Sequence, residues 1–306
     1  MTRFLEVDDL DPIRLMRVLD DAMVWKADGA TPPSILAGKG VAALFQKPSA
    51  RTRLSVEMAV TSLGGHPVYI RDEEVGLDAR ESVEDVARTM AGMCAAIAAR
   101  VFDHETLERM AAAVDVPVVN LLSDIAHPCQ AIADLLTIRE HYGSLEGRRL
   151  AFVGDGNNVA ASLAFAAALS GMELAVASPE SYELDPDVVE RARNLGGAIE
   201  VHGDAYDAVA DADVVYTDVW TSMGQEDEQR QRRRAFAGWT VDAALMKAAS
   251  DGAVFLHCLP AHRGDEVAAE VIDGPRSLVW QQAANRMHAL RALLVELLGT
   301  RESENS

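Results

Sequence analysis

Short apolar runs alternate along the chain with longer segments in which apolar residues recur at helical spacing. In the first half, this pattern predicts strands at 41–45, 67–70, 95–99 and 118–122 and helices near 52–63, 82–93, 104–114 and 129–142. In the second half, it predicts strands at 150–153, 174–177, 214–217 and 254–256 and helices near 158–170, 186–195 and 241–249. Alternating strands and helices are typical of parallel sheets covered on both faces. We therefore expect an α/β fold with two doubly wound parallel-sheet domains.

The pattern restarts after the segment Tyr142-Gly-Ser-Leu-Glu-Gly147, which marks the expected domain boundary. Residues 1–142 then form the first domain, and residues 143–306 form the second domain together with a C-terminal helix. That helix runs from about Gln281 to Leu298 and carries leucines at helical spacing. In open parallel sheets, ligands bind beyond the carboxyl ends of the strands. The residues that follow each strand are therefore the candidates for function.

Composition narrows the class of protein. The chain has 306 residues, of which 49% are hydrophobic, which is enough for the cores of two domains. A net charge of −20 argues against a nucleic-acid partner, because few basic residues are available to displace counterions. The three cysteines are far apart and imply no disulfide framework. We find no apolar run of signal-peptide or membrane length, and expect a soluble, cytoplasmic protein without a membrane partner.

The segment after the first strand is a candidate phosphate-binding site. Pro48 interrupts the strand pattern, and Ser49 is a good N-cap for the helix that follows. The N–H groups and the positive dipole end at the start of a helix attract anions. Ser49, Arg51 and Thr52 would add hydrogen bonds and charge. A capped helix with two solvated arginines, Arg51 and Arg53, explains the same residues equally well from local physics.

Three further hydrogen-bond donors follow the third and fourth strands: Arg100, His127 and Gln130. An arginine, a histidine and a glutamine around a carbonyl oxygen form an oxyanion site that is suited to acyl transfer. A lone histidine is more often structural than catalytic. His127, however, follows a strand end in the same half of the chain as the candidate phosphate site, so we favour a functional role for it.

The second half has two polar segments after strands. Gly154-Asp-Gly-Asn-Asn158 opens a helix, but Val159 stands where a dinucleotide-binding motif has its third glycine. Two amides at a helix start are better suited to a small polar ligand. Asp218-Val-Trp-Thr-Ser-Met-Gly-Gln225 offers a carboxylate, a hydroxyl and a glycine, and an ordinary turn is the alternative there.

A histidine and a cysteine, His257 and Cys258, follow the last strand, and His262 comes shortly after them. Zinc binding by these three residues is disfavoured, because no paired C-x-x-C or H-x-x-x-H unit is present. A nucleophilic cysteine is the other chemical interpretation. It requires a neighbouring base, which the sequence alone does not identify.

Taken in order, these segments resemble the aspartate/ornithine carbamoyltransferase family. The motifs that carry the resemblance are Ser49-Ala-Arg-Thr-Arg53, Arg100, His127-Pro-Cys-Gln130, Asp218-x-x-x-Ser222-Met-Gly224, His257-Cys-Leu-Pro260, Glu81-Ser82-x-x-Asp85 and Asn285-Arg286. The resemblance covers essentially the whole chain. The Asp-x-x-x-Ser-Met-Gly loop together with His-Cys-Leu-Pro is similar to the ornithine branch of the family rather than to the aspartate branch.

The resemblance implies that the first domain binds carbamoyl phosphate, that the second binds ornithine, and that the C-terminal helix packs back on the first domain. The residues implied for carbamoyl phosphate are Ser49, Ala50 through its backbone, Arg51, Thr52, Arg100, His127, Gln130 and Arg286. Those implied for ornithine are Asn158, Asp218, Ser222, Met223, Cys258 and Leu259. The candidates for catalysis are Arg100, His127 and Cys258. The resemblance implies no metal and no organic cofactor, and it implies a homotrimer, or a multiple of trimers, with shared active sites.

The sequence departs from the family pattern at two positions. Ala50 stands where the family usually has threonine, so a hydroxyl is lost while the backbone amide remains. Gly76 stands where ornithine enzymes commonly have a glutamine that reaches the phosphate of the neighbouring subunit. Either Arg80 or another nearby side chain replaces that contact, or phosphate binding is weaker. If Arg80 replaces it, we expect Gly76→Gln to be neutral or mildly beneficial; the alternative is that Arg80 only occupies a solvated helix start.

The expected reaction is carbamoyl transfer from carbamoyl phosphate to the side-chain amine of ornithine, which gives citrulline and phosphate. Three alternatives stay open: a carbamoyltransferase for another amine such as putrescine, lysine or N-acetylornithine, a nicotinamide-dependent dehydrogenase, and an inactive binding protein. Asp218 and the Ser222-Met-Gly224 loop favour a free amino acid over putrescine, which has no α-carboxylate. The missing third glycine disfavours the dehydrogenase, and the retained Arg51, Arg100 and His127 disfavour an inactive protein.

Overall fold

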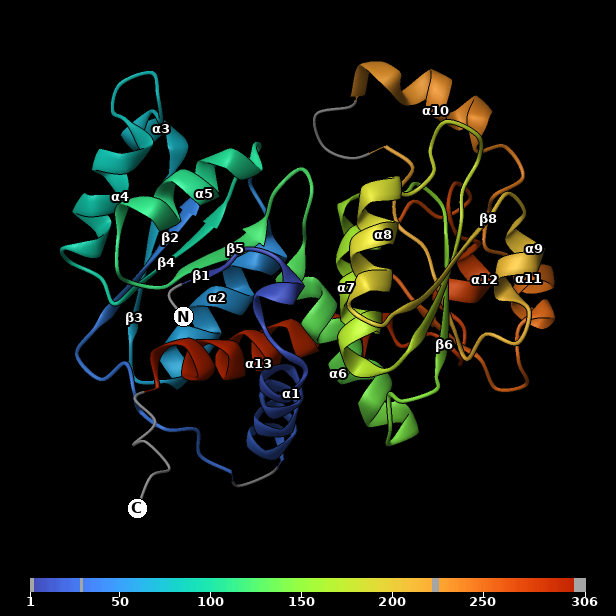
Figure 1. The fold of residues 1–306 in the computed structure, drawn as a ribbon, viewed down its shortest axis with the longest axis horizontal. Helices are drawn as coiled ribbons and strands as arrows, with labels where there is room; N and C mark the ends of the chain where they lie inside the picture. Colours follow the sequence, from blue (N-terminus) through green and yellow to red (C-terminus); the bar gives the residue numbers. More distant parts are fainter. Residues whose placement is uncertain (1–2, 28–29, 222–225, 300–306) are drawn as a thin grey trace. The chain divides into compact units, whose positions relative to one another are not determined.

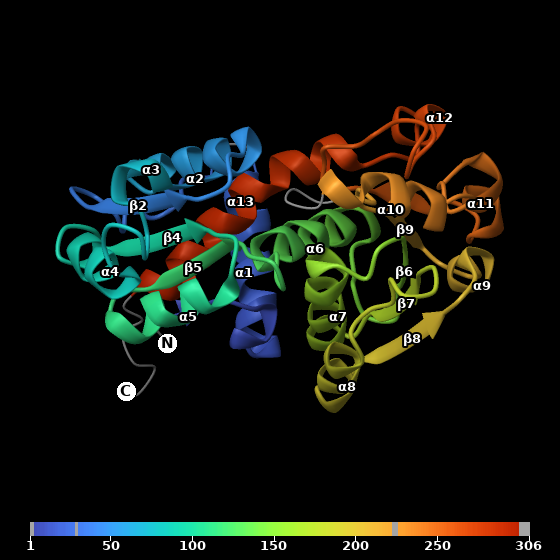
Figure 2. The same cartoon turned by 90° about the horizontal axis from the view of Figure 1, so that it is seen from above.

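The computed structural model describes residues 3–27, 30–221 and 226–299. The chain divides into two compact units, one made of residues 1–133 with 284–306 and the other of residues 134–283. Each unit is built on a five-stranded parallel sheet with helices on both faces (Figures 1 and 2). The predicted α/β fold with two parallel sheets is therefore confirmed.

The first unit has the strand order β1-β5-β4-β2-β3. Its strands are β1 (Arg3–Phe4), β2 (Gly40–Phe45), β3 (His66–Arg71), β4 (Ala96–Arg100) and β5 (Val118–Leu122). Its helices are the short η1 (Val7–Asp9), α1 (Pro12–Lys26), α2 (Ala50–Ser62), α3 (Asp72–Val75), α4 (Val83–Ala91) and α5 (His104–Ala113). Two helices are shared with the second unit, α6 (Pro128–Tyr142) and α13 (Val279–Leu298), because the unit boundaries fall at Ala133 and Ala284.

Alternation along the strands decides which helices cover which face of the first sheet. Ala42 and Leu44 of β2 point into a core formed with α4 and α5, while the residues between them face the other side. On that other side lie α1, α2 and the C-terminal part of α13 (Figure 1). Arg14 on α1 donates to Glu296 on α13 at 2.7 Å. The C-terminal helix therefore packs back on the first unit, as predicted.

The second unit has the strand order β10-β9-β6-β7-β8. Its strands are β6 (Arg149–Val153), β7 (Glu173–Ala177), β8 (Ala198–His202), β9 (Val214–Tyr216) and β10 (Val254–Leu256). Its further helices are α7 (Asn158–Ser170), α8 (Pro186–Asn194), α9 (Ala205–Val209), η2 (Glu226–Glu228), α10 (Gln229–Ala235), α11 (Ala243–Ala248) and α12 (Ala269–Ile272). Figure 1 shows α7 and α8 on one face of this sheet and α9, α11 and α12 on the other. Among the described residues, no helix combines the length and the apolar character that a membrane span requires.

The pattern of apolar residues does not predict several elements. The strands β1 and β8 are marginal in sequence, because β1 has two residues and β8 buries only Ile199. Helix α1 carries a usable signal, since Asp11 caps it and Pro12 occupies its first turn. The restart of the pattern places the domain boundary after Tyr142, whereas the two units divide within α6, between Ala133 and Asp134.

The backbone at Gly76 disagrees with a neutral Gly76→Gln as far as stability is concerned, whereas the effect on carbamoyl phosphate binding stays a prediction. Gly76 ends α3 with φ 62° and ψ 62°, a left-handed conformation that glycine adopts readily and other residues adopt at a cost. A Cβ at this position would also lie 3.1 Å from Cβ of Arg80. The glycine is therefore required locally by the turn that leads to Arg80.

A second glycine sets the path of the chain into α7. Gly156 donates its N–H to the carbonyl of Tyr182 at 2.8 Å, and a Cβ at this position would collide with the backbone of Glu183 and Leu184. Because both sides of this contact are backbone, neither can move aside cheaply. The loop between β6 and α7 therefore depends on a glycine at position 156.

We predict that Gly156→Ala lowers the free energy of unfolding by about 1–3 kcal/mol through overpacking. Gly203→Ala is the matched control, because a Cβ added there would meet no atom within 4 Å and the backbone at Gly203 is not left-handed. Urea denaturation of both variants measures the difference. Equal stabilities for the two variants would contradict this account of the loop.

Candidate functional site

The start of α2 has the features of an anion-binding helix terminus. Ser49 caps the helix, and its Oγ accepts the N–H of Thr52 at 3.4 Å and lies 3.0 Å from the Thr52 hydroxyl. The first turn contains no acidic residue, so the helix itself offers no carboxylate against its positive end. Pro48 and the extended backbone of Ser49 turn the chain from β2 into this position.

Two buried arginines converge on the same hydroxyl. Arg286 on α13 donates to Oγ1 of Thr52 at 2.8 Å, and Arg100 at the end of β4 donates to it at 3.4 Å. All three side chains are buried. Guanidinium groups placed together in a dry site create a positive potential that favours an anion with several oxygens. The structure thus brings Ser49, Thr52, Arg100 and Arg286 together, with Ala50 and Arg51 in the first turn of the same helix.

His127 and Gln130 are buried at the start of α6, in the same unit. Burial holds the pKa of His127 well below its usual value of 6.5, and the positive charges of Arg286 and Arg100 lower it further. His127 is therefore a neutral imidazole at neutral pH, able to donate one hydrogen bond to a carbonyl oxygen. Burial raises the pKa of the neighbouring Cys129 thiol to about 12, which excludes it as a thiolate nucleophile at neutral pH.

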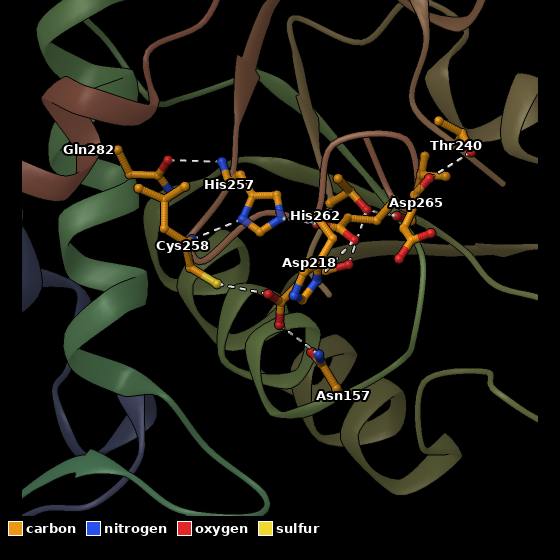
Figure 3. A network of polar contacts seen from close by, with 12 residues as sticks. Asn157, Asp218, Thr240, His257, Cys258, His262, Asp265 and Gln282 are labelled. Carbon is orange, nitrogen blue, oxygen red and sulfur yellow. Dashed lines mark hydrogen bonds and ion pairs between the residues drawn. The ribbon is translucent and has the colours of Figure 1, made fainter. Parts of the chain in front are cut away.

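The second unit holds a buried carboxylate, Asp218, between two neutral donors (Figure 3). The thiol of Cys258 donates to Oδ1 of Asp218 at 3.0 Å, and Nδ2 of Asn157 donates to Oδ2 at 2.9 Å. A cysteine that donates to a carboxylate carries its proton. This contact therefore supports a binding role for Cys258 rather than the nucleophilic one.

Asn157 is a residue of this cluster that the family resemblance does not name, although it is one of the two amides at this helix start. Its Oδ1 caps α7 by accepting the N–H groups of Val159 and Ala160, at 2.9 and 3.3 Å, which leaves its amide nitrogen to orient Asp218. The predicted residue, Asn158, is instead the first residue of α7. The usable cue is the N-cap preference for asparagine directly before a helix. Of the other predicted residues, Leu259 follows Cys258 directly, and Ser222 and Met223 lie outside the described residues.

One cluster of the described residues has the spacing of a metal site. Ligand atoms of Asp218, His257 and Cys258 lie within 4.8 Å of one another. Both nitrogens of His257 already have partners, since Nδ1 accepts the N–H of Leu259 at 2.9 Å and Nε2 lies 3.2 Å from Oε1 of Glu266. A metal ion would have to displace these hydrogen bonds. The three residues considered for zinc from the sequence are His257, Cys258 and His262. In the structure, Asp218 takes the place of His262 in this cluster.

Comparisons with known proteins match both the first and the second part of the chain. The carbamoyl-P binding domain of aspartate/ornithine carbamoyltransferases matches residues 2–140, and their Asp/Orn binding domain matches residues 146–297. An ornithine carbamoyltransferase of Acidothermus cellulolyticus is 51% identical over 299 residues, which cover 96% of each chain. The ornithine carbamoyltransferase structure from Pyrococcus furiosus has a TM-score of 0.93 at 44% identity and covers 98% of each chain. An N-acetyl-L-ornithine transcarbamylase structure is 28% identical with a TM-score of 0.87, and the match covers 97% of this chain and 100% of that one.

The lowered pKa of His127 predicts a specific pH dependence of stability. In the unfolded chain His127 binds a proton below about pH 6.5, whereas in the folded chain it stays neutral to lower pH. The unfolded state then binds more protons, so the free energy of unfolding falls as pH decreases through this window, by up to about 1.4 kcal/mol per pH unit.

The contribution of His127 is isolated by comparing the protein with its His127→Gln variant between pH 5 and 8. We expect the stability of the unaltered protein to fall relative to the variant below pH 6.5. A difference that stays constant across this range would show that His127 does not titrate differently on folding.

Proposed function

This chain belongs to the aspartate/ornithine carbamoyltransferase family, and we propose that it transfers the carbamoyl group of carbamoyl phosphate to the side-chain amine of ornithine. The products are citrulline and phosphate. The observation that carries the proposal is the convergence of Arg100 and Arg286 on Thr52 at the start of α2. Relatives with the name ornithine carbamoyltransferase, one of them 51% identical, support the choice of acceptor.

Carbamoyl phosphate is assigned to the first unit. Its phosphate binds at the start of α2, to Ser49, the backbone of Ala50, Arg51 and Thr52. Its carbamoyl group binds to Arg100, His127 and Gln130, with Arg286 beside the phosphate. The neutral His127 supports this assignment, because an imidazole with one N–H donates to a carbonyl oxygen without adding a third positive charge.

The reaction follows from these assignments. The lone pair of the amine attacks the carbonyl carbon and forms the new C–N bond, while the bond from that carbon to the phosphate oxygen breaks. Negative charge on the carbonyl oxygen is stabilised by Arg100 and His127, and the leaving phosphate takes its electron pair towards Arg51. The nitrogen loses one proton to the departing phosphate as the neutral ureido group of citrulline forms.

The amine must be neutral in order to attack. A side-chain amine with a pKa of about 10 is mostly protonated at neutral pH. Desolvation and nearby arginines both favour the neutral form of an amine. The carboxylate of Asp218 is then reserved for the α-ammonium group of the acceptor rather than for the attacking nitrogen.

Ornithine is assigned to the second unit, to Asn158, Asp218, Ser222, Met223, Cys258 and Leu259. Each oxygen of Asp218 already accepts one hydrogen bond, from Cys258 or from Asn157, and each has a second lone pair available. The carboxylate is therefore oriented before the acceptor arrives. A buried carboxylate prepared for an α-ammonium group disfavours acceptors in which that group is absent or acetylated.

We further propose a cytoplasmic homotrimer. Leu54 and Met58 lie one turn apart on α2 and are 60% and 54% exposed, next to the edge strand β3 of the first sheet. Exposed apolar side chains beside an open sheet edge favour burial against another copy of the chain. Three cysteines without a disulfide fit a reducing compartment. Arg80 remains our candidate for a contact with the neighbouring subunit.

We predict that Arg51→Ala weakens carbamoyl phosphate binding about tenfold to a hundredfold, the value of one charge-assisted hydrogen bond. Arg53→Ala is the matched control, because Arg53 pairs with Glu57 at 2.7 Å and stacks on Tyr69. Steady-state kinetics with carbamoyl phosphate as the varied substrate measures both. Equal affinities of Arg51→Ala and Arg53→Ala for carbamoyl phosphate would show that Arg51 is not a phosphate ligand.

We predict that Asp218→Asn raises the ornithine KM about tenfold or more, because a charge-assisted contact to the α-ammonium group is lost. The KM for carbamoyl phosphate should change little. Asp211→Asn, at an exposed aspartate close in sequence, is the control. Assays of the unaltered protein with ornithine, putrescine, lysine and N-acetylornithine complete the test. Faster carbamoylation of putrescine than of ornithine would overturn the choice of acceptor.

We predict that Met58→Glu shifts the protein from trimer towards monomer, because it places a charge in the proposed interface. Met93→Glu, at a more exposed methionine (76%) elsewhere in the first unit, should leave the mass unchanged. Light scattering during size-exclusion chromatography gives the mass of each. A trimer that persists in Met58→Glu at micromolar concentration would exclude this face of α2.

A further inference from the structure

We propose that His257 is a positioning residue for the acceptor: its Nδ1 holds the backbone of Leu259, and the buried carboxylate of Glu266 selects the tautomer in which Nδ1 can do so. The inference rests on the proposed function, in which Cys258 and Leu259 contact ornithine. It assigns a role to two residues that do not themselves touch a substrate.

The backbone at Leu259 needs such support. Leu259 has φ 60°, a left-handed conformation that is uncommon for a residue with a branched side chain. Its N–H donates to Nδ1 of His257 at 2.9 Å. A backbone N–H can only donate, so Nδ1 must present its lone pair. A neutral His257 therefore carries its proton on Nε2.

Glu266 accounts for this choice of tautomer. Its Oε1 lies 3.2 Å from Nε2 of His257, and both side chains are almost completely buried. The same oxygen accepts the backbone N–H of His262, and the backbone carbonyl of Glu266 accepts the N–H of Val241 at 2.9 Å. The bond from His262 thus holds the carboxylate of Glu266, and the bond from Val241 holds its backbone. A fixed acceptor at Nε2 stabilises the proton there and keeps Nδ1 available to Leu259.

The backbone of His257 is anchored independently of its ring. Its N–H donates to Oε1 of Gln282 at 2.9 Å, and Nε2 of Gln282 donates to Oδ1 of Asp134 at 2.7 Å. Gln282 also lies 3.1 Å from the hydroxyl of Tyr216, in the β9 strand that leads to Asp218. The backbone of His257 is therefore fixed independently of the ring's hydrogen bond to Leu259.

The hydrogen bond between His257 and Leu259 affects the acceptor site through Cys258. Cys258 lies between His257 and Leu259 in the chain, and its thiol donates to Asp218 at 3.0 Å. If Leu259 leaves its left-handed conformation, the backbone that carries the Cys258 thiol changes direction. We therefore expect damage to His257 to appear in the binding of the acceptor, while the carbamoyl phosphate residues of the first unit keep their geometry.

Two amide replacements separate the two nitrogens of His257. In His257→Asn, the side-chain oxygen lies close to the former Nδ1 and can still accept the N–H of Leu259. In His257→Gln, the amide lies close to the former Nε2 and the acceptor for Leu259 is lost. We expect the ornithine KM to rise about tenfold or more in His257→Gln but only about threefold or less in His257→Asn. The KM for carbamoyl phosphate should stay within about twofold in both.

His262→Gln is the matched control, because the side chain of His262 is 59% exposed and the contact with Glu266 comes mainly from its backbone. It should leave both KM values unchanged. A role in packing alone predicts similar losses of melting temperature and activity for His257→Asn and His257→Gln. That outcome would overturn the proposal, as would a His262 variant as impaired as His257→Gln.

A test on the unaltered protein does not depend on activity. Nitrogen-15 NMR of histidine-labelled protein, with His257→Asn used for assignment, reports which ring nitrogen carries the proton. We expect the Nε2–H tautomer for His257, and an Nδ1–H tautomer would refute the proposal. If the unaltered protein does not carbamoylate ornithine, the proposed function fails while this measurement still decides the tautomer.

Discussion

The first unit depends on holding two guanidinium groups of like charge against one buried hydroxyl. Arg100 and Arg286 approach Thr52 from different parts of the sequence, one from the end of a central strand and one from the last helix. Buried charges cost free energy unless a partner offsets their desolvation, and like charges repel each other. An anion with several oxygens removes both costs. The overall charge of −20 repels such anions, so the attraction must be created locally, at this point.

The candidate sites of the two units have opposite electrostatics. In the first unit, burial and the neighbouring arginines lower the pKa of His127 and keep it neutral, so the positive charge resides on groups that cannot lose it. In the second unit, the carboxylate of Asp218 accepts hydrogen bonds from a thiol and an amide, which are neutral donors and add no positive charge of their own. The site in the first unit is therefore suited to a phosphate, and the site in the second unit is suited to an ammonium group. Transfer between an anionic and a cationic substrate requires this combination.

Sequence patterns predicted the features that depend on local rules. The alternation of strands and helices, the Ser49 cap and the candidate phosphate segment follow from periodicity and from helix-start preferences. Features that depend on contacts between distant residues were not predictable. Nothing in the spacing of Asn157 and Asn158 shows which of them faces Asp218, and no motif connects Glu266 to the tautomer of His257. The expectation for Gly76 fails for stability because a left-handed backbone is not visible in a pattern of side chains.

If the arginines around Thr52 form the anion site, they bind inorganic phosphate, a product of the proposed reaction. Calorimetric titration with phosphate measures this binding most directly. Arg286→Gln should lower the affinity for phosphate about tenfold to a hundredfold, because one charged hydrogen-bond donor is lost. Arg291→Gln, which alters another buried arginine on α13, should leave the affinity unchanged. Equal affinities for the unaltered protein and Arg286→Gln would contradict the account.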